Sequence, residues 1–124
     1  MITVARNTGI GGKYIFGDNG ERLEVKPIKI SCSSSGDNTI VSLVSDKKIR
    51  VLSWDLISNG IVNVKWKSSS TTELTGLYYL IANTGIAKSF TELGFYFETS
   101  IGEALVLNLS AAIAVGGSIN YVEV

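Results

Sequence analysis

The stretch Ile49–Ser68, IRVLSWDLISNGIVNVKWKS, decides the fold. Apolar and polar residues alternate on both sides of Asn59-Gly60, a dipeptide typical of a tight turn. Because successive side chains of a strand point to opposite faces, this alternation predicts two strands that each have one apolar face. The apolar faces consist of Leu52, Trp54 and Leu56 in the first strand and Val62, Val64 and Trp66 in the second.

The register of these two strands can be tested from the sequence. A two-residue turn at Asn59-Gly60 would place Trp54 beside Lys65, so an apolar face would lie next to a charged one. A loop over residues 59–61 would instead place Trp54 beside Trp66. We therefore expect an odd-length loop, a β-bulge, or two strands that lie in opposite sheets.

The rest of the chain continues the strand pattern. Its 124 residues include 13 Gly and one Pro, and turn residues recur throughout, which is typical of a β-sandwich or barrel. We expect a hairpin with its turn at Asp18-Asn19-Gly20, an edge strand at Pro27, and a loop over residues 31–38. We predict an N-terminal arm and first hairpin strand over 1–20, flexible over 1–12, and one β-sandwich domain over 21–124.

A late segment, Glu98–Ala112, allows several interpretations. As a strand it places Leu105, Leu107 and Leu109 on one face, whereas a helix would separate Leu107 from the other two. We therefore predict a strand, and leave Ala111–Val115 open between an irregular link and a helical turn. Glu98 and Glu103 could act as a glycosidase pair only if folding held them about 5–10 Å apart in a cleft. We expect instead two solvated side chains at the rims of a hairpin turn over residues 99–102.

Composition excludes several kinds of chemistry. The chain contains no histidine, which removes the usual general base and most zinc sites. The single cysteine, Cys32, cannot form an intrachain disulfide and is expected to be a buried structural thiol. Asp37, Asp46 and Asp55 are spaced too widely for a calcium loop. We expect no enzyme activity, no cofactor and no metal.

Charge and hydropathy bear on the partners. Lys plus Arg and Asp plus Glu both number 11, so we expect neither nucleic acid nor a membrane as a partner. The densest basic cluster, Lys47, Lys48 and Arg50, is interpreted as a solvated strand end. The amino-terminal segment lacks an apolar core of signal-peptide length, and no apolar run is long enough to span a membrane.

Aromatic residues gather between positions 78 and 97. Alternation predicts that Phe95 and Phe97 share a face in the sandwich core while Tyr96 points outward. Tyr78 and Tyr79 cannot both point inward. Outward tyrosines favour an oligomer interface first and a sugar-stacking platform second.

The carboxyl-terminal two thirds of the chain carry a resemblance to a known class of proteins. The segments KKIRVLSWDL, LTGLYYLIANTG and ELGFYFETSIGEALVLNLSAAIAVGGSINYVEV resemble small β proteins encoded among bacteriophage virion genes. Such proteins resemble jelly-roll capsid decoration (cement) proteins or tail-associated subunits, which are commonly trimers.

The resemblance implies a fold, a function and partners. We expect a jelly-roll-like antiparallel β-sandwich of about eight strands. The implied function is decoration: a homotrimer that binds the major capsid protein on the outer capsid surface and stabilises the shell. It would be synthesised in the bacterial host cytoplasm and reside in the virion. The alternative is a tail-associated carbohydrate- or receptor-binding module.

Two sets of residues are expected to make the contacts. The residues expected to contact the capsid are Arg6, Asn7, Ile10 and Lys13. Those expected at the trimer interface are Tyr78 and Tyr96.

Overall fold

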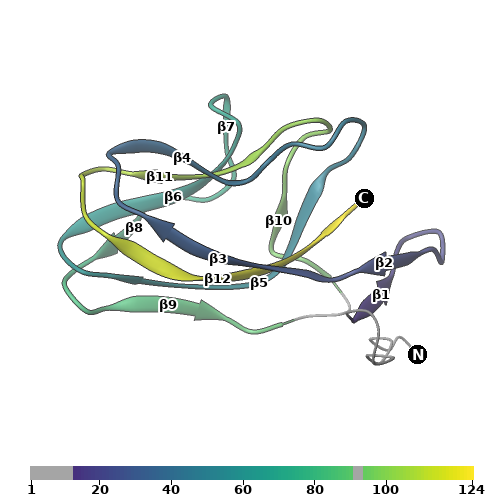
Figure 1. The fold of residues 1–124 in the computed structure, drawn as a ribbon, viewed down its shortest axis with the longest axis horizontal. Helices are drawn as coiled ribbons and strands as arrows, with labels where there is room; N and C mark the ends of the chain where they lie inside the picture. The colour runs from purple at the N-terminus through teal and green to yellow at the C-terminus, as the bar shows by residue number, and fades with distance from the viewer. Residues whose placement is uncertain (1–12, 91–93) are drawn as a thin grey trace.

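The computed structural model describes residues 13–90 and 94–124, and within these ranges the chain forms twelve β-strands and no helix (Figure 1). The strands are β1 (Tyr14–Phe16), β2 (Arg22–Glu24), β3 (Lys26–Cys32), β4 (Gly36–Val41), β5 (Ile49–Ser58), β6 (Val62–Ser68), β7 (Thr72–Glu73), β8 (Tyr78–Leu80), β9 (Gly85–Lys88), β10 (Phe97–Glu98), β11 (Leu105–Leu109) and β12 (Val115–Glu123). The predicted all-β sandwich is confirmed.

Two antiparallel sheets form the two layers of the sandwich. The first has the order β3-β12-β5, and both β9 and β10 pair with the far side of β5. The second has the order β4-β11-β6, and both β7 and β8 pair with the far side of β6. Strands outnumber the expected eight because the last position of each sheet is occupied by two short strands, and because β1 and β2 form a separate hairpin.

The connection at Asn59-Gly60 joins strands of opposite sheets, since β5 belongs to the first sheet and β6 to the second. This was one of the three alternatives that the sequence allowed. Both apolar faces point into the space between the layers, so the two strands need not pair with each other. Trp54 and Trp66 meet there with ring centroids 5.7 Å apart at an interplanar angle of 75°.

A β-bulge in β5 creates a second core cluster. The register of β5 against β12 shifts between Asn120 and Tyr121, which leaves Leu52 as an extra residue. The prediction that Leu52 shares a face with Trp54 and Leu56 is therefore wrong. Leu52 lies in a separate cluster, whose other buried members are Ile15, Leu23, Val25 and Val122.

The amino-terminal hairpin supplies part of this second cluster. β1 pairs with β2, as predicted, and the turn between them has Gly20 at φ 78°. Ile15 and Leu23 point from the hairpin toward the cluster, so the hairpin packs on the sandwich. The boundary proposed at residues 20 and 21 falls inside this turn, and the two-part division stays a prediction. The flexible arm predicted over 1–12 lies outside the described residues.

The late strand has the predicted face, but its preceding turn differs. Leu105, Leu107 and Leu109 are all buried in the main core. The hairpin expected over residues 99–102 is wrong, because β10 belongs to the first sheet and β11 to the second. This crossing is held by Thr99, whose Oγ1 accepts a hydrogen bond from the backbone N–H of Ile49 at 2.9 Å.

The loop predicted over residues 31–38 is also wrong in extent. Ser31 and Cys32 end β3, and Gly36 already begins β4, so residues 33–35 alone connect the two strands. Pairing with β12 and β11 satisfies the backbone of these small polar residues and outweighs their low strand propensity. Pro27 lies on β3, the outer strand of its sheet, as predicted. Residues 111–114 form an irregular link before β12 begins at Val115.

Asp37 joins three strands on the outer face of the second sheet. Its Oδ1 accepts a hydrogen bond from Asn108 Nδ2 at 2.7 Å and lies 3.1 Å from Lys67 Nζ. The hydrogen bond from Asn108, and then the contacts with Lys67, lower the pKa of Asp37 below its usual range. A carboxyl whose pKa is lower in the folded state stabilises the fold above its unfolded pKa and loses this contribution as the pH falls through the folded pKa.

This arrangement predicts an acid-sensitive contribution from Asp37. Asp37→Asn is expected to lower the urea midpoint near neutral pH, and the difference from the wild type is expected to shrink as the pH falls well below the ordinary aspartate pKa of about 4. Urea titrations across this pH range would measure the difference. Two pH profiles separated by a constant offset would contradict the assignment.

Candidate functional site

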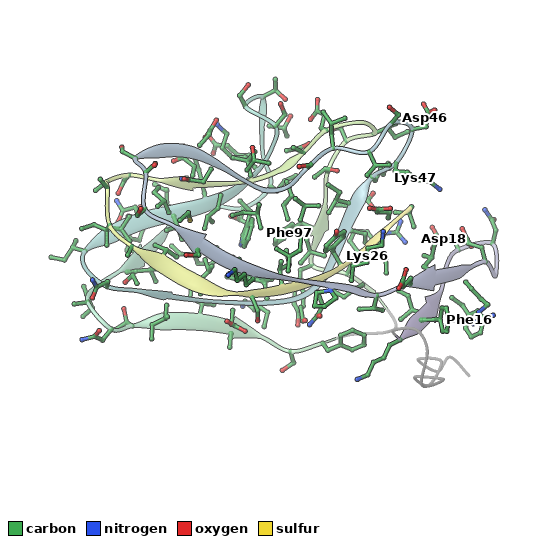
Figure 2. The ribbon with its side chains drawn as sticks, in the orientation of Figure 1. Phe16, Asp18, Lys26, Asp46, Lys47 and Phe97 are labelled. Atoms are coloured by element: carbon green, nitrogen blue, oxygen red, sulfur yellow. The ribbon has the colours of Figure 1, made fainter. Side chains whose placement is uncertain are left out.

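At one end of the sandwich, the connections that the structure describes contain no charged residue. Four connections meet there, at the left of Figure 1. They are residues 33–35 (SSS), 59–61 (NGI), 81–84 (IANT) and 110–114 (SAAIA). Lysine, arginine, aspartate and glutamate are absent from all four, although 18% of the chain is charged. At the opposite end lie charged residues such as Asp18, Asp46 and Lys47 (Figure 2). We call the four connections the uncharged end.

Beside the uncharged end, four large apolar side chains are exposed on the second sheet. The ladder of β6 and β8 pairs Val62 with Leu80, so the next step places Ile61 opposite Ile81. We call this group the apolar corner: Ile61 (74% exposed), Leu77 (42%), Tyr79 (75%) and Ile81 (60%). Exposed apolar side chains that gather at one place make this corner a candidate interaction surface.

The two adjacent tyrosines point in opposite directions, as the alternation required. Tyr78 is half-buried, and its ring centroid lies 5.5 Å from that of Trp54. Its expected outward orientation is therefore wrong, and Tyr79 is the outward member. The sequence did not reveal this because apolar residues, Leu77 and Leu80, occur in both phases of the alternation. Tyr96 is 42% exposed, and its hydroxyl donates a hydrogen bond to the Ser89 carbonyl oxygen at 2.7 Å.

The two phenylalanines near β10 do not share an environment. Phe97 points between the layers (Figure 2), with its ring centroid 5.6 Å from that of Trp66. Phe95 is 44% exposed, and the guanidinium carbon of Arg50 lies 4.4 Å from its ring centroid. The prediction of a core position is wrong for Phe95, because β10 spans Phe97–Glu98 alone and the alternation does not extend to residue 95.

Glu98 lies at the centre of an ion-pair network at the end opposite the uncharged end. Arg50 Nε lies 2.9 Å from Glu98 Oε1, and Lys48 Nζ lies 3.2 Å from Glu98 Oε2. Asp18, from the hairpin turn, lies 3.6 Å from Arg50. The interpretation of the basic cluster as a solvated strand end is therefore wrong for Arg50, whose side chain is 14% exposed. Lys47 is exposed, and the side chain of Lys48 remains 37% exposed beside Glu98. Opposite charges brought together by β5, β10 and the hairpin explain the difference.

Glu103 is held by different elements from Glu98. Its Oε1 accepts a hydrogen bond from Ser68 Oγ at 2.6 Å, and the same Oγ accepts one from the Ser100 N–H at 3.0 Å. The expectation that both glutamates are solvated at the rims of a hairpin turn is therefore wrong. Neither lines the two pockets described below. Each of the two carboxylates therefore has its own hydrogen-bond or ion-pair partners on separate elements.

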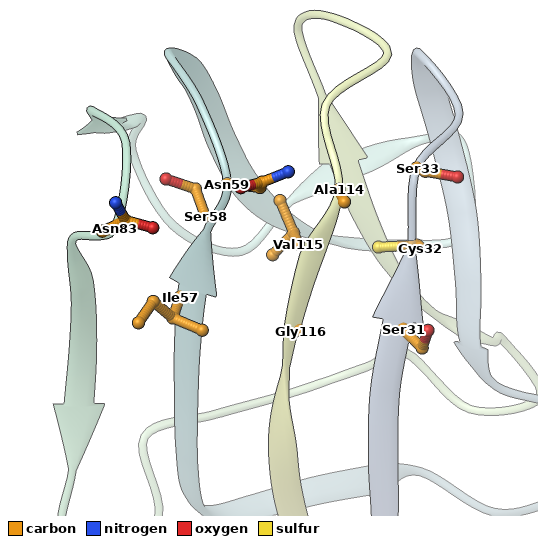
Figure 3. A pocket seen from close by; sticks show the side chains of 10 residues that line it. All are labelled: Ser31, Cys32, Ser33, Ile57, Ser58, Asn59, Asn83, Ala114, Val115 and Gly116. Atoms are coloured by element: carbon orange, nitrogen blue, oxygen red, sulfur yellow. The ribbon is translucent and has the colours of Figure 1, made fainter.

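A pocket of about 420 Å³ opens at the uncharged end (Figure 3). Its floor lies over Gly116 of β12, which pairs with Ser31 of β3 on one side and with Ile57 of β5 on the other. None of its lining residues is charged. They are Ser31, Cys32, Ser33, Ile57, Ser58, Asn59, Asn83, Ala114, Val115 and Gly116.

A second pocket of about 310 Å³ shares Ser31, Cys32 and Ser33 with the first. Cys32 is half-buried, and this burial raises the pKa of its thiol. The neutral thiol is therefore favoured, but Cys32 is less buried than the sequence predicted. Within residues 13–90 and 94–124, no three His, Cys, Asp or Glu side chains lie close enough together to hold a metal ion.

The residues expected to contact a capsid lie at the amino terminus. Lys13 is exposed immediately before β1. Arg6, Asn7 and Ile10 lie outside the described residues. In the part of the chain that the structure describes, no helix is long and apolar enough to cross a membrane. Comparison with protein-family models, curated proteins and solved structures finds no match for this chain.

Proposed function

We propose that the protein is a virion structural protein of a bacteriophage, a jelly-roll decoration subunit that binds the outer surface of the capsid as a trimer. In this role it would bridge neighbouring capsid subunits and stabilise the shell by burying apolar area. The resemblance of the carboxyl-terminal two thirds to phage virion proteins is one support. The strand order and the apolar corner are two others.

The order of strand pairing supports a jelly roll. Counting from β3, the first strand pairs with the last (β12), and the second (β4) pairs with the one before it (β11). Further in, β5 pairs with β9 and β10, and β6 pairs with β7 and β8. This nested pattern is that of one long hairpin. The hairpin folds back on itself, because β12 also pairs with β5 and β11 also pairs with β6. Eight strand positions in two four-position sheets are typical of a jelly roll.

The apolar corner carries the proposal of self-association. Its four side chains lie on one edge of the second sheet, beside an end that has no charged loop residue. Copies of a chain with zero net charge are not kept apart by long-range repulsion. Together with neighbouring surface residues, the apolar corner could form an interface of the standard size, about 800 Å² per partner. Tyr79 takes the place in this interface that had been expected for Tyr78, and Tyr96 remains a predicted contact.

Light scattering tests the trimer. The wild type is expected to have a mass about three times the 13.3 kDa of the chain. The double variant Ile61→Asp/Tyr79→Ser is expected to be monomeric, because a buried unpaired carboxylate and a lost aromatic anchor together weaken association at least about 100-fold. Ile101→Asp is a matched control, since Ile101 is 62% exposed but lies in the connection between β10 and β11.

Circular dichroism would verify that all three proteins share one fold. A monomeric wild type would contradict the trimer, and a double variant that stays trimeric would exclude the apolar corner as its interface. The virion assignment has a separate readout, in which mass spectrometry of gradient-purified phage particles should detect this chain in a fixed ratio to the major capsid protein. Its absence from the particles would refute that assignment.

A further inference from the structure

We propose that the pocket at the uncharged end binds a neutral saccharide, with one sugar ring seated over Gly116. This site does not depend on the trimer or on the virion role, because it is built from other residues. It differs from the sugar-stacking platform expected at Tyr78 or Tyr96, since neither tyrosine lines it.

The shape of the pocket follows from one missing side chain. Gly116 lies between Ser31 and Ile57 in the ladder, so the sheet surface is hollow at that position (Figure 3). The resulting volume of about 420 Å³ lies within the range of small-molecule sites. The connections that contain Asn59 and Asn83 form the sides of the pocket, and backbone hydrogen bonds fix both connections. The Asn59 N–H donates to the Ala114 carbonyl oxygen at 2.9 Å, and the Asn83 N–H donates to the Ser58 carbonyl oxygen at 2.8 Å.

The polar groups of the pocket match a ligand rich in hydroxyl groups. Ser31 and Ser33 offer hydroxyls, and Asn59 and Asn83 offer amides, so each side chain can both donate and accept hydrogen bonds. Among the described residues, none of these four side chains hydrogen-bonds to another protein group. Sugar hydroxyls also both donate and accept hydrogen bonds. They therefore match these four side chains better than a ligand that can only donate or only accept.

The remaining lining contributes apolar contact and no charge. Ile57 is 53% exposed and Ala114 is exposed, so both can pack against the C–H face of a sugar ring. A phosphate, sulfate or carboxylate would find no lysine or arginine in the lining to compensate its charge. The second pocket continues the polar surface beyond Ser33 with Ser34 and Thr39, which gives room for a further sugar unit. Lys29 lines this second pocket and is absent from the lining of the first, so the preference for a neutral ligand applies to the ring over Gly116.

Gly116 also provides the decisive variant. A Cβ built at Gly116 would meet its nearest atom, the Ile30 carbonyl oxygen, at 3.7 Å, which is ordinary contact. Gly116→Leu is therefore expected to fold and to fill the pocket. Asn59→Ala is a second variant that removes one amide and leaves the pocket open.

The experiment is a titration of ¹⁵N-labelled full-length protein with maltohexaose, cellohexaose and chitohexaose as neutral probes. Oligogalacturonate serves as an anionic probe and a Gly-Ser octapeptide as a neutral peptide. At least one neutral saccharide is expected to shift the amide signals of Ser33 and Gly116 with a Kd on the order of 1 mM. Gly116→Leu should weaken this binding at least about tenfold, and Asn59→Ala about fivefold.

Each alternative result would overturn the proposal. These results are no shift with any neutral saccharide up to about 20 mM, stronger binding of the anionic or peptide probe, or unchanged binding by both variants. Light scattering on the same samples separates this site from the trimer. Both pocket variants are expected to keep the oligomeric state of the wild type.

Discussion

Gly117→Ala is expected to lower the free energy of unfolding by at least about 3 kcal/mol, because the fold has no room for a Cβ at this position. Gly117 has φ 152°, a backbone conformation that residues with a side chain rarely adopt. A Cβ built on it would lie 2.0 Å from the Asp55 carbonyl oxygen. That oxygen belongs to the backbone of β5, so it cannot move without disturbing the pairing of β5 with β12.

The neighbouring glycine provides the matched control. Gly116→Ala meets no contact closer than 3.7 Å and is expected to change the stability by less than about 0.5 kcal/mol. Urea denaturation of both variants, followed by tryptophan fluorescence, measures the difference. Equal stability of the two variants would show that β12 does not approach β5 as closely as described.

Trp66→Ala is expected to cost about 3–5 kcal/mol, since it removes the largest fully buried side chain of the main core. The ring of Trp66 contacts Trp54 across the two layers, and it also lies against Phe97. Its removal therefore leaves a cavity where both sheets meet. The transition midpoint in urea should fall accordingly, with little change in the slope if unfolding remains cooperative.

Two further substitutions serve as controls: one keeps an aromatic ring in the core, and the other removes an aromatic ring from the surface. Trp66→Phe is expected to cost roughly 1–2 kcal/mol, because it keeps an aromatic ring and loses no hydrogen bond. The indole Nε1 of Trp66 has no hydrogen-bond partner among the described residues. Tyr79→Ala, at a 75% exposed position, is expected to change the stability of the subunit fold by less than about 0.5 kcal/mol. A Trp66→Ala variant as stable as Tyr79→Ala would contradict the central position of Trp66.

Where a pattern repeats over many residues, the sequence alone was informative about the fold. The alternation in Ile49–Ser68 predicted two strands, and the mismatch at Asn59-Gly60 restricted their relation to three alternatives, one of which is observed. The alternation of Leu105, Leu107 and Leu109 likewise predicted their common buried face. In short segments the same reasoning failed, as with Phe95, which precedes a two-residue strand.

The candidate sites were much harder to predict. The pocket combines Ser31, Ile57, Asn83 and Gly116, which come from three strands and one turn that are distant in the sequence. None of these residues belongs to a motif. The sequence shows that the four connections contain no charged residue, but only the strand order brings them together at one end.

Local sequence was sufficient for the fold class, for the strands with a long alternating pattern and for the amino-terminal hairpin, because the alternation of side chains is a property of the extended backbone itself. Tertiary structure decided which strands pair, that Leu52 leaves the main core, and that Tyr79 rather than Tyr78 faces outward. Each of these outcomes depends on which partner a strand meets across the sandwich. A one-residue change of phase reverses the faces of a strand, and contacts between distant parts of the chain select the phase.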